Sequence, residues 1–407
     1  MAREFDITTI AVWFKRQLTS RRAKGSPPTI TTMTQAFDIC IRGGGIVGHA
    51  LALLLARERL RVGLVVQPAA TPAGPSAASG DVRAYALNAK SRALLESLRC
   101  WPDDRHATEV LTMQVRGDDG GTVSFSAGEL KVPGLTWIVD VPTIEAHLAE
   151  AVRFQHAIEV LEAPCPATLT VICEGRASST RAEFGIDFDV VPYPQTAIAA
   201  RLQCQKPHSQ TAFQWFSQGE ILAFLPLEGP QGNSVGIVWS VLRGRADALL
   251  HESGEAFSEQ LELASEGRLG KLSLISGRSA WPLQSAHARR WVGTHAGDAW
   301  ALAGDAAHNV HPLAGQGLNL GLSDAAALTT TLGQREYWRK VDDLRLLRRY
   351  ERSRKAEVAV MDTTMNGLQS LFSRQGGSWQ ALRNWGMNGF ERSSLIKQWV
   401  ARQAMGH

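Results

Sequence analysis

The stretch CIRGGGIVGHA, from Cys40 to Ala50, decides the fold. An apolar run at 37–42 leads into its glycines and predicts a strand, and GHALALLLARE at 48–58 predicts a helix that is apolar on nearly every side. RVGLVVQ at 61–67 predicts a second buried strand. A strand, a glycine-rich turn, a buried helix and another apolar strand form the βαβ unit that opens a parallel sheet.

The glycines of this turn fit the pattern G-x-G-x-x-G, directly after a strand and at the start of a helix. In that context Gly43 permits a tight turn, Gly45 lets the backbone approach a pyrophosphate, and Gly48 lets helix and strand pack closely. Amide groups at the helix start then face the phosphate. A nucleotide site is the favoured interpretation, and a glycine-rich turn without a ligand is the alternative.

Gln67 stands at the end of the second strand, where dinucleotide sites usually have an acid that binds the ribose. A neutral hydrogen bond contributes about 0.5–1.5 kcal/mol, against about 1.5–3 kcal/mol for one to a charged group. We therefore expect about tenfold weaker binding or less, which leaves dinucleotide binding intact. A plain polar residue at the strand end is the alternative for Gln67.

A second motif is GDAAHNVHPLAGQGLNLGLSD at 304–324. A strand that ends at Gly304 and Asp305 places this carboxylate at the carboxyl edge of the sheet, where ligands of parallel sheets bind. The loop from Pro312 to Gly317 is poor in side chains, and the helix that begins at Leu318 directs its amide groups toward whatever the loop contacts.

Two histidines in the same motif raise the question of a metal site. His308 and His311 have no cysteine or carboxylate cluster nearby beyond Asp305, which disfavours metal binding. Asp324 is expected to be a residue of the helix face or its packing rather than a catalytic one.

Bulk composition limits the class of protein. The chain has 407 residues, of which 44% are hydrophobic and 20% charged, enough for a folded core and two domains. Residues 1–32 hold six basic and two acidic residues, which accounts for the whole net charge of +4. The neutral remainder argues against a nucleic-acid-binding protein.

Five scattered cysteines without a C-x-x-C pair favour neither a disulfide framework nor a zinc site. No run reaches the ~18 apolar residues of a membrane span, and the start lacks a signal-peptide pattern. We expect a cytoplasmic protein whose residues 1–34 form a disordered N-terminal extension, with a misassigned start of the chain as the alternative for residues 1–32.

Taken together, the motifs strongly resemble the flavin-dependent aromatic monooxygenases of the p-hydroxybenzoate hydroxylase fold, and among them the ubiquinone-biosynthesis hydroxylases. The resemblance covers about residues 35–406. It is carried by GGGIVG, DVRAYALN (81–88), MQVRGDDGG (113–121), WIVD (137–140), VICEGRASSTR (171–181), LPL (225–227), GDAAHNVHPLAGQGLNLG, RRYERSRKAE (348–357) and RQAMG (402–406).

The resemblance implies an α/β fold, with a Rossmann-like FAD-binding domain, an inserted antiparallel-sheet substrate domain and C-terminal helices. The segments expected after the extension are a first FAD-binding segment (35–115), FAD-domain helices with the second fingerprint (116–190), the substrate domain (191–285), a second FAD-binding segment (286–340) and C-terminal helices (341–407).

The resemblance also implies which residues bind FAD. Gly43, Gly45 and Gly48 hold the pyrophosphate and Arg83 lies along the cofactor, with Gln67 at the adenosine end. Gly304 and Asp305 bind the ribityl or pyrophosphate region. The residues expected to line the isoalloxazine ring run from Pro312 to Asn319 and include Gly315, Gly317 and Leu318.

The implied reaction transfers oxygen from a flavin C4a-hydroperoxide to an electron-rich aromatic ring, with reduced nicotinamide or another reductant as a transient electron donor. The implied substrate is a lipophilic polyprenyl phenol or quinol intermediate of ubiquinone biosynthesis. Other quinone-biosynthesis proteins, a second copy of the chain and peripheral contact with the inner membrane stay open as partners. Two alternatives are a hydroxylase of a soluble aromatic compound and a non-catalytic flavin-binding subunit.

Four departures from the family pattern concern the adenosine end: Arg42 in a strand, Gln67, Glu174-Gly175 in place of Asp-Gly, and a short segment at 155–170 where the family has a longer β excursion. Arg42 either faces the pyrophosphate and offsets the contact missing at Gln67, or pairs with a carboxylate such as Glu174.

The substrate is expected under strands of the middle segment, among them 221–227 and 234–241. Candidate wall residues are Trp215, Phe216, Phe224 and Trp239, with plain core packing as the alternative. The basic helices expected from about Arg345 onward either contact a membrane surface or a partner, or cap the FAD-binding domain.

Overall fold

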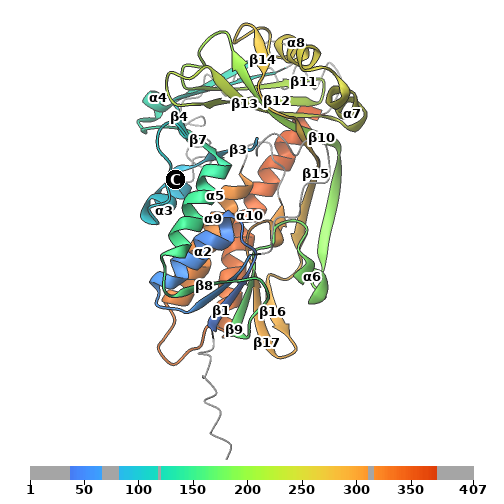
Figure 1. Ribbon diagram of the computed structural model, residues 1–407. Helices are drawn as coiled ribbons and strands as arrows, with labels where there is room; N and C mark the ends of the chain where they lie inside the picture. Colours follow the sequence, from blue (N-terminus) through green and yellow to red (C-terminus); the bar gives the residue numbers. More distant parts are fainter. Residues whose placement is uncertain (1–36, 67–81, 118–120, 310–315, 374–407) are drawn as a thin grey trace, which may run out of the picture. The chain divides into compact units, whose positions relative to one another are not determined.

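The computed structural model describes residues 37–66, 82–117, 121–309 and 316–373, and Figure 1 shows them as ribbons. The expected N-terminal extension at 1–34 and the expected helices beyond residue 373 lie outside the described residues. The described residues form a six-stranded sheet, a nine-stranded sheet and a small three-stranded sheet.

The first sheet contains the predicted βαβ unit, with strands in the order β16-β17-β9-β1-β2-β8. β1 pairs in parallel with β2 on one side and with β9 on the other. It is therefore an interior strand, and its carboxyl end has a neighbouring strand on each side. The hairpin of β16 and β17 is antiparallel. The strands are β1 (Phe37–Arg42), β2 (Val62–Val65), β8 (Ile158–Leu161), β9 (Ala167–Ile172), β16 (Val292–His295) and β17 (Asp298–Leu302).

Helix α2 (Ile46–Arg57) is the predicted apolar helix, and it begins earlier than residue 48 because Gly45 is already its N-cap. It shares one buried core with the sheet and with the helices α5 (Val141–Arg153) and α9 (Gly317–Gly333), which lie beside it in Figure 1. Because neighbours surround α2, its sequence is apolar on nearly every side.

The nine-stranded sheet has the order β18-β15-β10-β13-β12-β11-β5-β6, with β14 beside β10. Its neighbours are antiparallel apart from β11 and β5, which pair in parallel. The strands are β5 (Thr112–Arg116), β6 (Thr122–Ser126), β10 (Phe188–Cys204), β11 (Thr211–Ser217), β12 (Glu220–Leu227), β13 (Ser234–Leu242), β14 (Leu272–Leu274), β15 (Ser279–Ala288) and β18 (His308–Asn309). β12 and β13 match the strands expected at 221–227 and 234–241, whereas β5 and β6 were expected within the FAD-binding domain.

Helices α7 (Arg243–His251) and α8 (Gly254–Ala264) cover the outer face of this sheet, as Figure 1 shows. Trp215, Phe224 and Trp239 belong to the buried core between the sheet and these helices, together with Phe257 of α8. None of the three lines the cavity described below, and plain core packing, the alternative for them, is what the structure shows, because strand alternation turns them to the opposite face of the sheet. Phe216, the fourth candidate, is half-buried on β11 and does not line that cavity either.

The remaining elements connect the two sheets. The third sheet pairs β7 (Thr136–Asp140) with β3 (Ala84–Leu87) and β4 (Ala107–Val110). The shorter helices are α3 (Ala89–Ser97), α4 (Ala127–Leu130) and α6 (Ser179–Glu183).

The strand that was expected to end at Gly304 and Asp305 is shorter in the structure. β17 ends at Leu302, a 3₁₀ turn spans Gly304–Ala306, and β18 joins the nine-stranded sheet. Gly304 has a φ of +64°, a left-handed conformation that favours glycine and turns the chain out of the first sheet. The chain therefore crosses between the two sheets at this motif.

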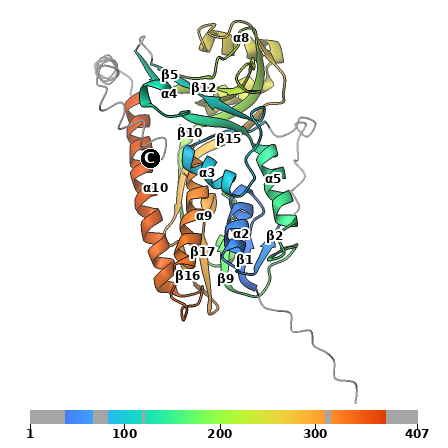
Figure 2. The same cartoon turned by 90° about the vertical axis from the view of Figure 1, so that its left-hand side faces the viewer.

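Helix α10 (Leu344–Ser373) runs along the outer side of α9, as Figure 2 shows, and begins where the sequence predicts a helix. Leu347, Tyr350, Arg354 and Val358 are buried against the rest of the fold. Over its described side chains, α10 thus caps the FAD-binding domain with one face. No helix among the described residues is both long and apolar enough to span a bilayer.

Candidate active site

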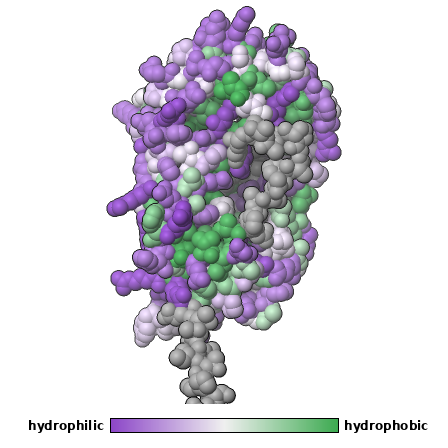
Figure 3. Space-filling view, in the orientation of Figure 1, coloured by the Kyte–Doolittle hydropathy of each residue, from purple (hydrophilic) through white to green (hydrophobic). Residues whose placement is uncertain are grey.

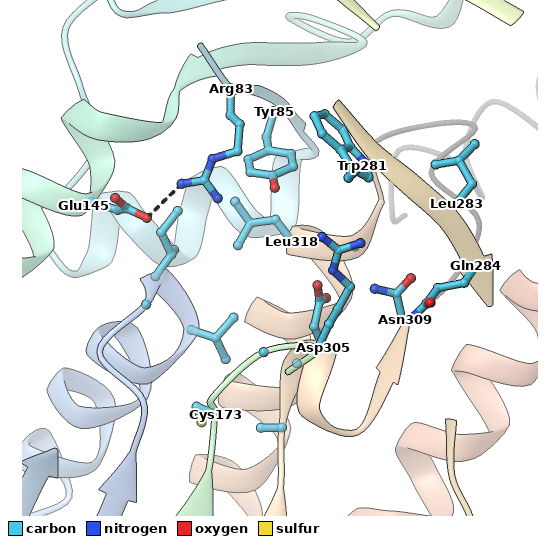
Figure 4. Close-up of a pocket in the computed structure, with 18 of the residues that line it drawn as sticks. Arg83, Tyr85, Glu145, Cys173, Trp281, Leu283, Gln284, Asp305, Asn309 and Leu318 are labelled. Carbon is cyan, nitrogen blue, oxygen red and sulfur yellow. Dashed lines mark ion pairs between the residues drawn. The ribbon is translucent and has the colours of Figure 1, made fainter. Parts of the chain in front are cut away.

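A cavity of about 360 Å³ opens between the carboxyl edge of the parallel sheet and strand β15. Figure 3 shows this face hollowed between the two sheets, and Figure 4 shows the cavity in close-up. The lining residues are Gly45, Ile46, Val47, Arg83, Tyr85, Glu145, Cys173, Gly175, Arg176, Trp281, Pro282, Leu283, Gln284, Ala303, Gly304, Asp305, Asn309, Gly317 and Leu318. Gly45, Cys173 and Ala303 closely follow β1, β9 and β17, so the cavity lies where parallel sheets bind ligands.

The three glycines of the fingerprint have different geometric roles. Gly43 has a φ of +124°, and a Cβ there would collide with the carbonyl group of Cys173. A Cβ at Gly48 would collide with the carbonyl oxygen of Gly43, because the helix packs directly on the turn. Gly45 lines the cavity, and apart from its chain neighbours no described residue has an atom within 4 Å of its Cβ position. Two glycines shape the turn, and the third leaves room for a ligand against the backbone.

Two helices begin at the cavity, α2 and α9, and neither has a side-chain cap. By contrast, Asn88, Ser178 and Ser253 accept hydrogen bonds from first-turn amides of α3, α6 and α8. No described side chain caps the first-turn amides of α2 and α9, so these amides are suited to face a ligand, and the positive end of each helix dipole favours an anionic group.

Asp305 lies in the 3₁₀ turn after β17, and its side chain points into the cavity in Figure 4. None of the described residues donates a hydrogen bond to its carboxylate. Burial raises the pKa of this carboxyl, while the neighbouring His308 and Arg176 side chains act in the opposite direction. A largely buried carboxylate without a donor is suited to accept hydrogen bonds from hydroxyl groups of a ligand.

A buried ionic cluster holds the turn that carries Asp305. Asp324 of α9 is fully buried, and its Oδ2 accepts hydrogen bonds from the Gly304 amide at 2.8 Å and from Nε2 of His308 at 2.6 Å. Its Oδ1 accepts from Nε of Arg354 at 2.7 Å. Burial acts to raise the pKa of Asp324, but His308 and Arg354 outweigh it and lower the pKa. Asp324 thus joins α10 to the cofactor turn, as a packing residue and not as a cavity residue.

Arg83 and Tyr85 form one side of the cavity, on and beside β3, as Figure 4 shows. Nη2 of Arg83 lies 3.6 Å from Oε1 of Glu145 on α5. Asp140, at the start of the same helix, pairs with Arg201 of β10. These two ion pairs connect α5 with β3 and with the nine-stranded sheet beside the cavity.

The opposite side of the cavity comes from β15 and β18. Trp281, Pro282 and Leu283 of β15 line it. The side-chain amides of Gln284 and Asn309 lie beside each other, as Figure 4 shows. With Tyr85 across from Trp281, this end of the cavity has aromatic and apolar walls with a few polar groups. Such a lining is typical of a site that orients an aromatic small molecule.

The segment Glu174-Gly175, which we call the second fingerprint, is held by the ion pair with Arg42 that the sequence left open as an alternative. Nε of Arg42 lies 3.7 Å from Oε1 of Glu174, and its Nη2 donates to Oε2 of Glu183 at 2.8 Å. Glu174 also accepts hydrogen bonds from Ser178 and from Thr180. Burial acts to raise the pKa of Glu174, but these hydrogen bonds and Arg42 lower it. Arg42 is not among the residues that line the cavity, so two departures from the family pattern compensate each other.

Arg181 connects the second fingerprint to the cofactor turn. Its Nη1 donates to the carbonyl oxygen of Ala306 at 2.9 Å and to that of Gly175 at 3.3 Å. Its guanidinium also lies 3.7 Å from the ring centre of Phe188. Gly175 and Asp305 are thereby held on one wall of the cavity.

The structure brings six of the predicted cofactor residues together at the cavity: Gly45, Arg83, Gly304, Asp305, Gly317 and Leu318. Gly43 and Gly48 lie behind it and shape the turn. The predictions for Gln67, Pro312 and Gly315 lie outside the described residues.

Asn319 does not line the cavity and has a different role from the expected one. Its Oδ1 accepts hydrogen bonds from the Asn88 amide at 3.0 Å and from Ser91 at 2.7 Å, and its Nδ2 donates to the carbonyl of Ala86 at 2.8 Å. The side chain thus uses its hydrogen bonds to fasten α9 to β3 and α3.

Sequence reasoning missed the walls formed by Tyr85, Glu145, Trp281 and Asn309. Tyr85 and Asn309 lie inside quoted motifs, and Tyr85 stands two residues after Arg83, a spacing that places both side chains on one face of a strand. Glu145 and Trp281 had none, because only the tertiary fold brings α5 and β15 to the cavity.

The residues present fit FAD. An open glycine backbone and helix starts without a side-chain cap suit a pyrophosphate, and Asp305, to which no described residue donates a hydrogen bond, suits the ribityl hydroxyls. Among the described residues, no group of three His, Cys, Asp or Glu side chains has the arrangement of a metal site.

Comparisons with known proteins agree with this site. A family described as FAD binding domain matches residues 162–364. A 3-demethoxyubiquinol 3-hydroxylase from Escherichia coli is 28% identical, with 91% of this chain and 99% of that protein covered. The uncharacterized protein slr1300 of Synechocystis is 30% identical, with 86% of this chain and 88% of that protein covered.

Among solved structures, p-nitrophenol 4-monooxygenase PnpA from Pseudomonas putida matches with a TM-score of 0.69 at 14% identity, covering 91% of this chain and 98% of that one. At this identity the match supports the fold alone.

The family match and the sequence relatives show that the chain belongs to the family of FAD-dependent aromatic monooxygenases in which the ubiquinone-biosynthesis hydroxylases are found.

Proposed function

We propose that this protein hydroxylates the aromatic ring of a polyprenyl phenol or quinol intermediate in ubiquinone biosynthesis. The observation that carries the proposal is the end-to-end similarity to the E. coli hydroxylase, combined with an FAD-compatible cavity that has aromatic walls. Reduced nicotinamide or another reductant would serve as a transient electron donor.

When bound, FAD supplies the activation of O₂ and the transfer of one oxygen atom to the ring. The chain's own residues bind and orient the reactants. The backbone at Gly45 and the first turn of α2 would hold the pyrophosphate, and Asp305 would accept hydrogen bonds from the ribityl chain. The start of α9, at Gly317 and Leu318, would stabilise negative charge on the reduced flavin.

The walls of the cavity have two tasks in this proposal. Tyr85, Trp281 and Leu283 offer apolar surface against which an electron-rich ring can stack, and they exclude water that would divert the oxygen-transfer step. Gln284 and Asn309 offer amide groups to a phenolic hydroxyl. No strong acid or base is needed among these residues, because the activating chemistry belongs to the cofactor.

A soluble aromatic substrate is the alternative that the same cavity also allows. Substrate-stimulated oxidation of reduced nicotinamide, compared between a short-chain prenyl phenol and soluble phenolic acids, separates the two. The second alternative, a non-catalytic flavin-binding subunit, was based on the departures from the family pattern at the adenosine end. The Arg42–Glu174 ion pair weakens this alternative, because two of these departures compensate each other.

Deletion of the gene and analysis of accumulated quinone intermediates test the proposal. We expect one under-hydroxylated polyprenyl intermediate to accumulate, wild-type protein to restore ubiquinone, and an Asp305→Ala variant to restore less. Unchanged ubiquinone in the deletion strain, together with loss of growth on a soluble aromatic compound, would favour the alternative.

A further inference from the structure

The outer face of α10 carries a stripe of arginines. Arg345, Arg348, Arg349 and Arg352 are exposed, and their spacing of three and four residues places them on one side of the helix. The buried residues of α10, among them Leu347 and Tyr350, lie on the opposite side. We refer to the four arginines as the arginine stripe.

The charges of the arginine stripe have no counter-charge among the described residues. None of the four arginines, and not the exposed Lys340, forms an ion pair with a described residue. Seven basic and four acidic residues lie between Arg335 and Arg352, in a chain whose remainder after residue 32 is neutral overall.

Three of the four acids in this segment are engaged in ion pairs. Arg339 pairs with both Glu336 and Asp343, and Lys355 pairs with Glu351. Asp342 is the acid of this segment that no described ion pair occupies. The stripe therefore presents an excess of positive charge to solvent.

An aromatic pair accompanies the stripe in the segment that leads into α10. Tyr337 is 95% exposed and Trp338 is 65% exposed, and their rings lie 4.9 Å apart in an edge-on arrangement. Exposed Tyr and Trp side chains that precede, in sequence, arginines without an ion pair to a described residue are a combination that suits a lipid headgroup layer, since the rings enter the interface and the cations bind phosphates.

We infer that the arginine stripe, Lys340, Tyr337 and Trp338 form a docking surface for an anionic phospholipid membrane. A nucleic acid or an acidic protein could use the same charges and aromatic rings. The choice of a membrane rests on the proposed function, because a polyprenyl substrate dissolves in the bilayer. Docking through one face of α10 leaves its other face in the core of the fold.

The test uses the full-length, FAD-loaded protein and vesicles of phosphatidylcholine alone or with phosphatidylglycerol. The stripe variant combines Arg345→Gln, Arg348→Gln, Arg349→Gln and Arg352→Gln. A control variant removes the same charge at exposed basic residues elsewhere, with Arg105→Gln, Arg153→Gln, Lys206→Gln and Arg243→Gln. Thermal unfolding of each variant checks that the fold is retained.

We expect sedimentation with anionic vesicles but not with neutral ones, and weaker binding at high salt. The stripe variant should bind at least a hundredfold more weakly, because about 1 kcal/mol for each basic residue corresponds to about fivefold per arginine. The control variant should change by less than about threefold. Trp338→Ala should reduce the binding that persists at high salt.

Equal losses in the stripe and control variants, or equal binding to neutral vesicles, would overturn the inference. So would tighter binding to duplex DNA than to anionic vesicles. Hydroxylation of a water-soluble short-chain substrate without vesicles is measured in parallel and should not change in the stripe variant. Absence of that activity in every variant would reject the proposed function and leave the vesicle result standing.

Discussion

The Gly45→Ala substitution should weaken FAD binding without unfolding the protein. Gly45 has φ −81° and ψ −177°, a conformation that alanine adopts, and apart from its chain neighbours no described residue has an atom within 4 Å of its Cβ position. The apoprotein should lose about 1 kcal/mol or less, the cost of a poorer N-cap. The added methyl group points into the space where the pyrophosphate meets the backbone, so FAD affinity should fall by roughly 10- to 100-fold, or about 1.4–2.8 kcal/mol.

Gly48→Ala is the matched control, because it adds the same methyl group behind the turn. Its Cβ would collide with the carbonyl oxygen of Gly43, and overpacking of this kind costs about 1–3 kcal/mol whether or not FAD is present. Titration of each apoprotein with FAD, followed by flavin fluorescence, and thermal unfolding without FAD separate the two effects. Unchanged FAD affinity in Gly45→Ala would refute the placement of the pyrophosphate at this glycine.

Three further substitutions test other regions of the site. Asp324→Asn should lower the free energy of unfolding by about 3–5 kcal/mol in chemical denaturation, because Arg354 loses its buried counter-charge; a loss below about 1 kcal/mol would contradict this role. In the wild type, FAD affinity should rise as pH increases through the raised pKa of Asp305, because the ionised carboxylate accepts the ribityl hydroxyls, and Asp305→Asn should remove this pH dependence in FAD titrations. Arg42→Val should cost about 1–2 kcal/mol of stability near neutral pH, and less as pH falls through the lowered pKa of Glu174, where the carboxylate is lost. The FAD affinity of Arg42→Val should stay within about twofold of the wild-type value. A tenfold loss of affinity would instead indicate that Arg42 contacts the pyrophosphate.

Local sequence signals predicted the elements of the fold that depend on short-range patterns. The glycine turn between two apolar runs predicted β1, α2 and β2, and alternation predicted β12 and β13. The parallel pairing of β5 with β11 was not predicted, because the two strands are far apart in the sequence and nothing local encodes their register.

The site shows the same division. Gly45, Arg83 and Asp305 were found because motifs fix the backbone around them, and the structure brings them to one cavity. Trp215 and Trp239 were misplaced because an aromatic residue in a strand reveals its burial but not which face of the sheet it occupies. For Arg42, the sequence allowed two partners, the pyrophosphate or a carboxylate. Only the packing of α6 against the turn decided in favour of the carboxylates of Glu174 and Glu183.

The most direct test of the account is a single turnover in ¹⁸O₂. Reduced, FAD-loaded protein is mixed with a short-chain polyprenyl phenol or quinol and then with labelled oxygen, and the product is analysed by mass spectrometry. The account predicts a hydroxylated ring that carries one ¹⁸O atom, with a lower yield in Gly45→Ala at limiting FAD. Reoxidation of the flavin with release of hydrogen peroxide and no labelled product, for every such intermediate tried, would contradict it.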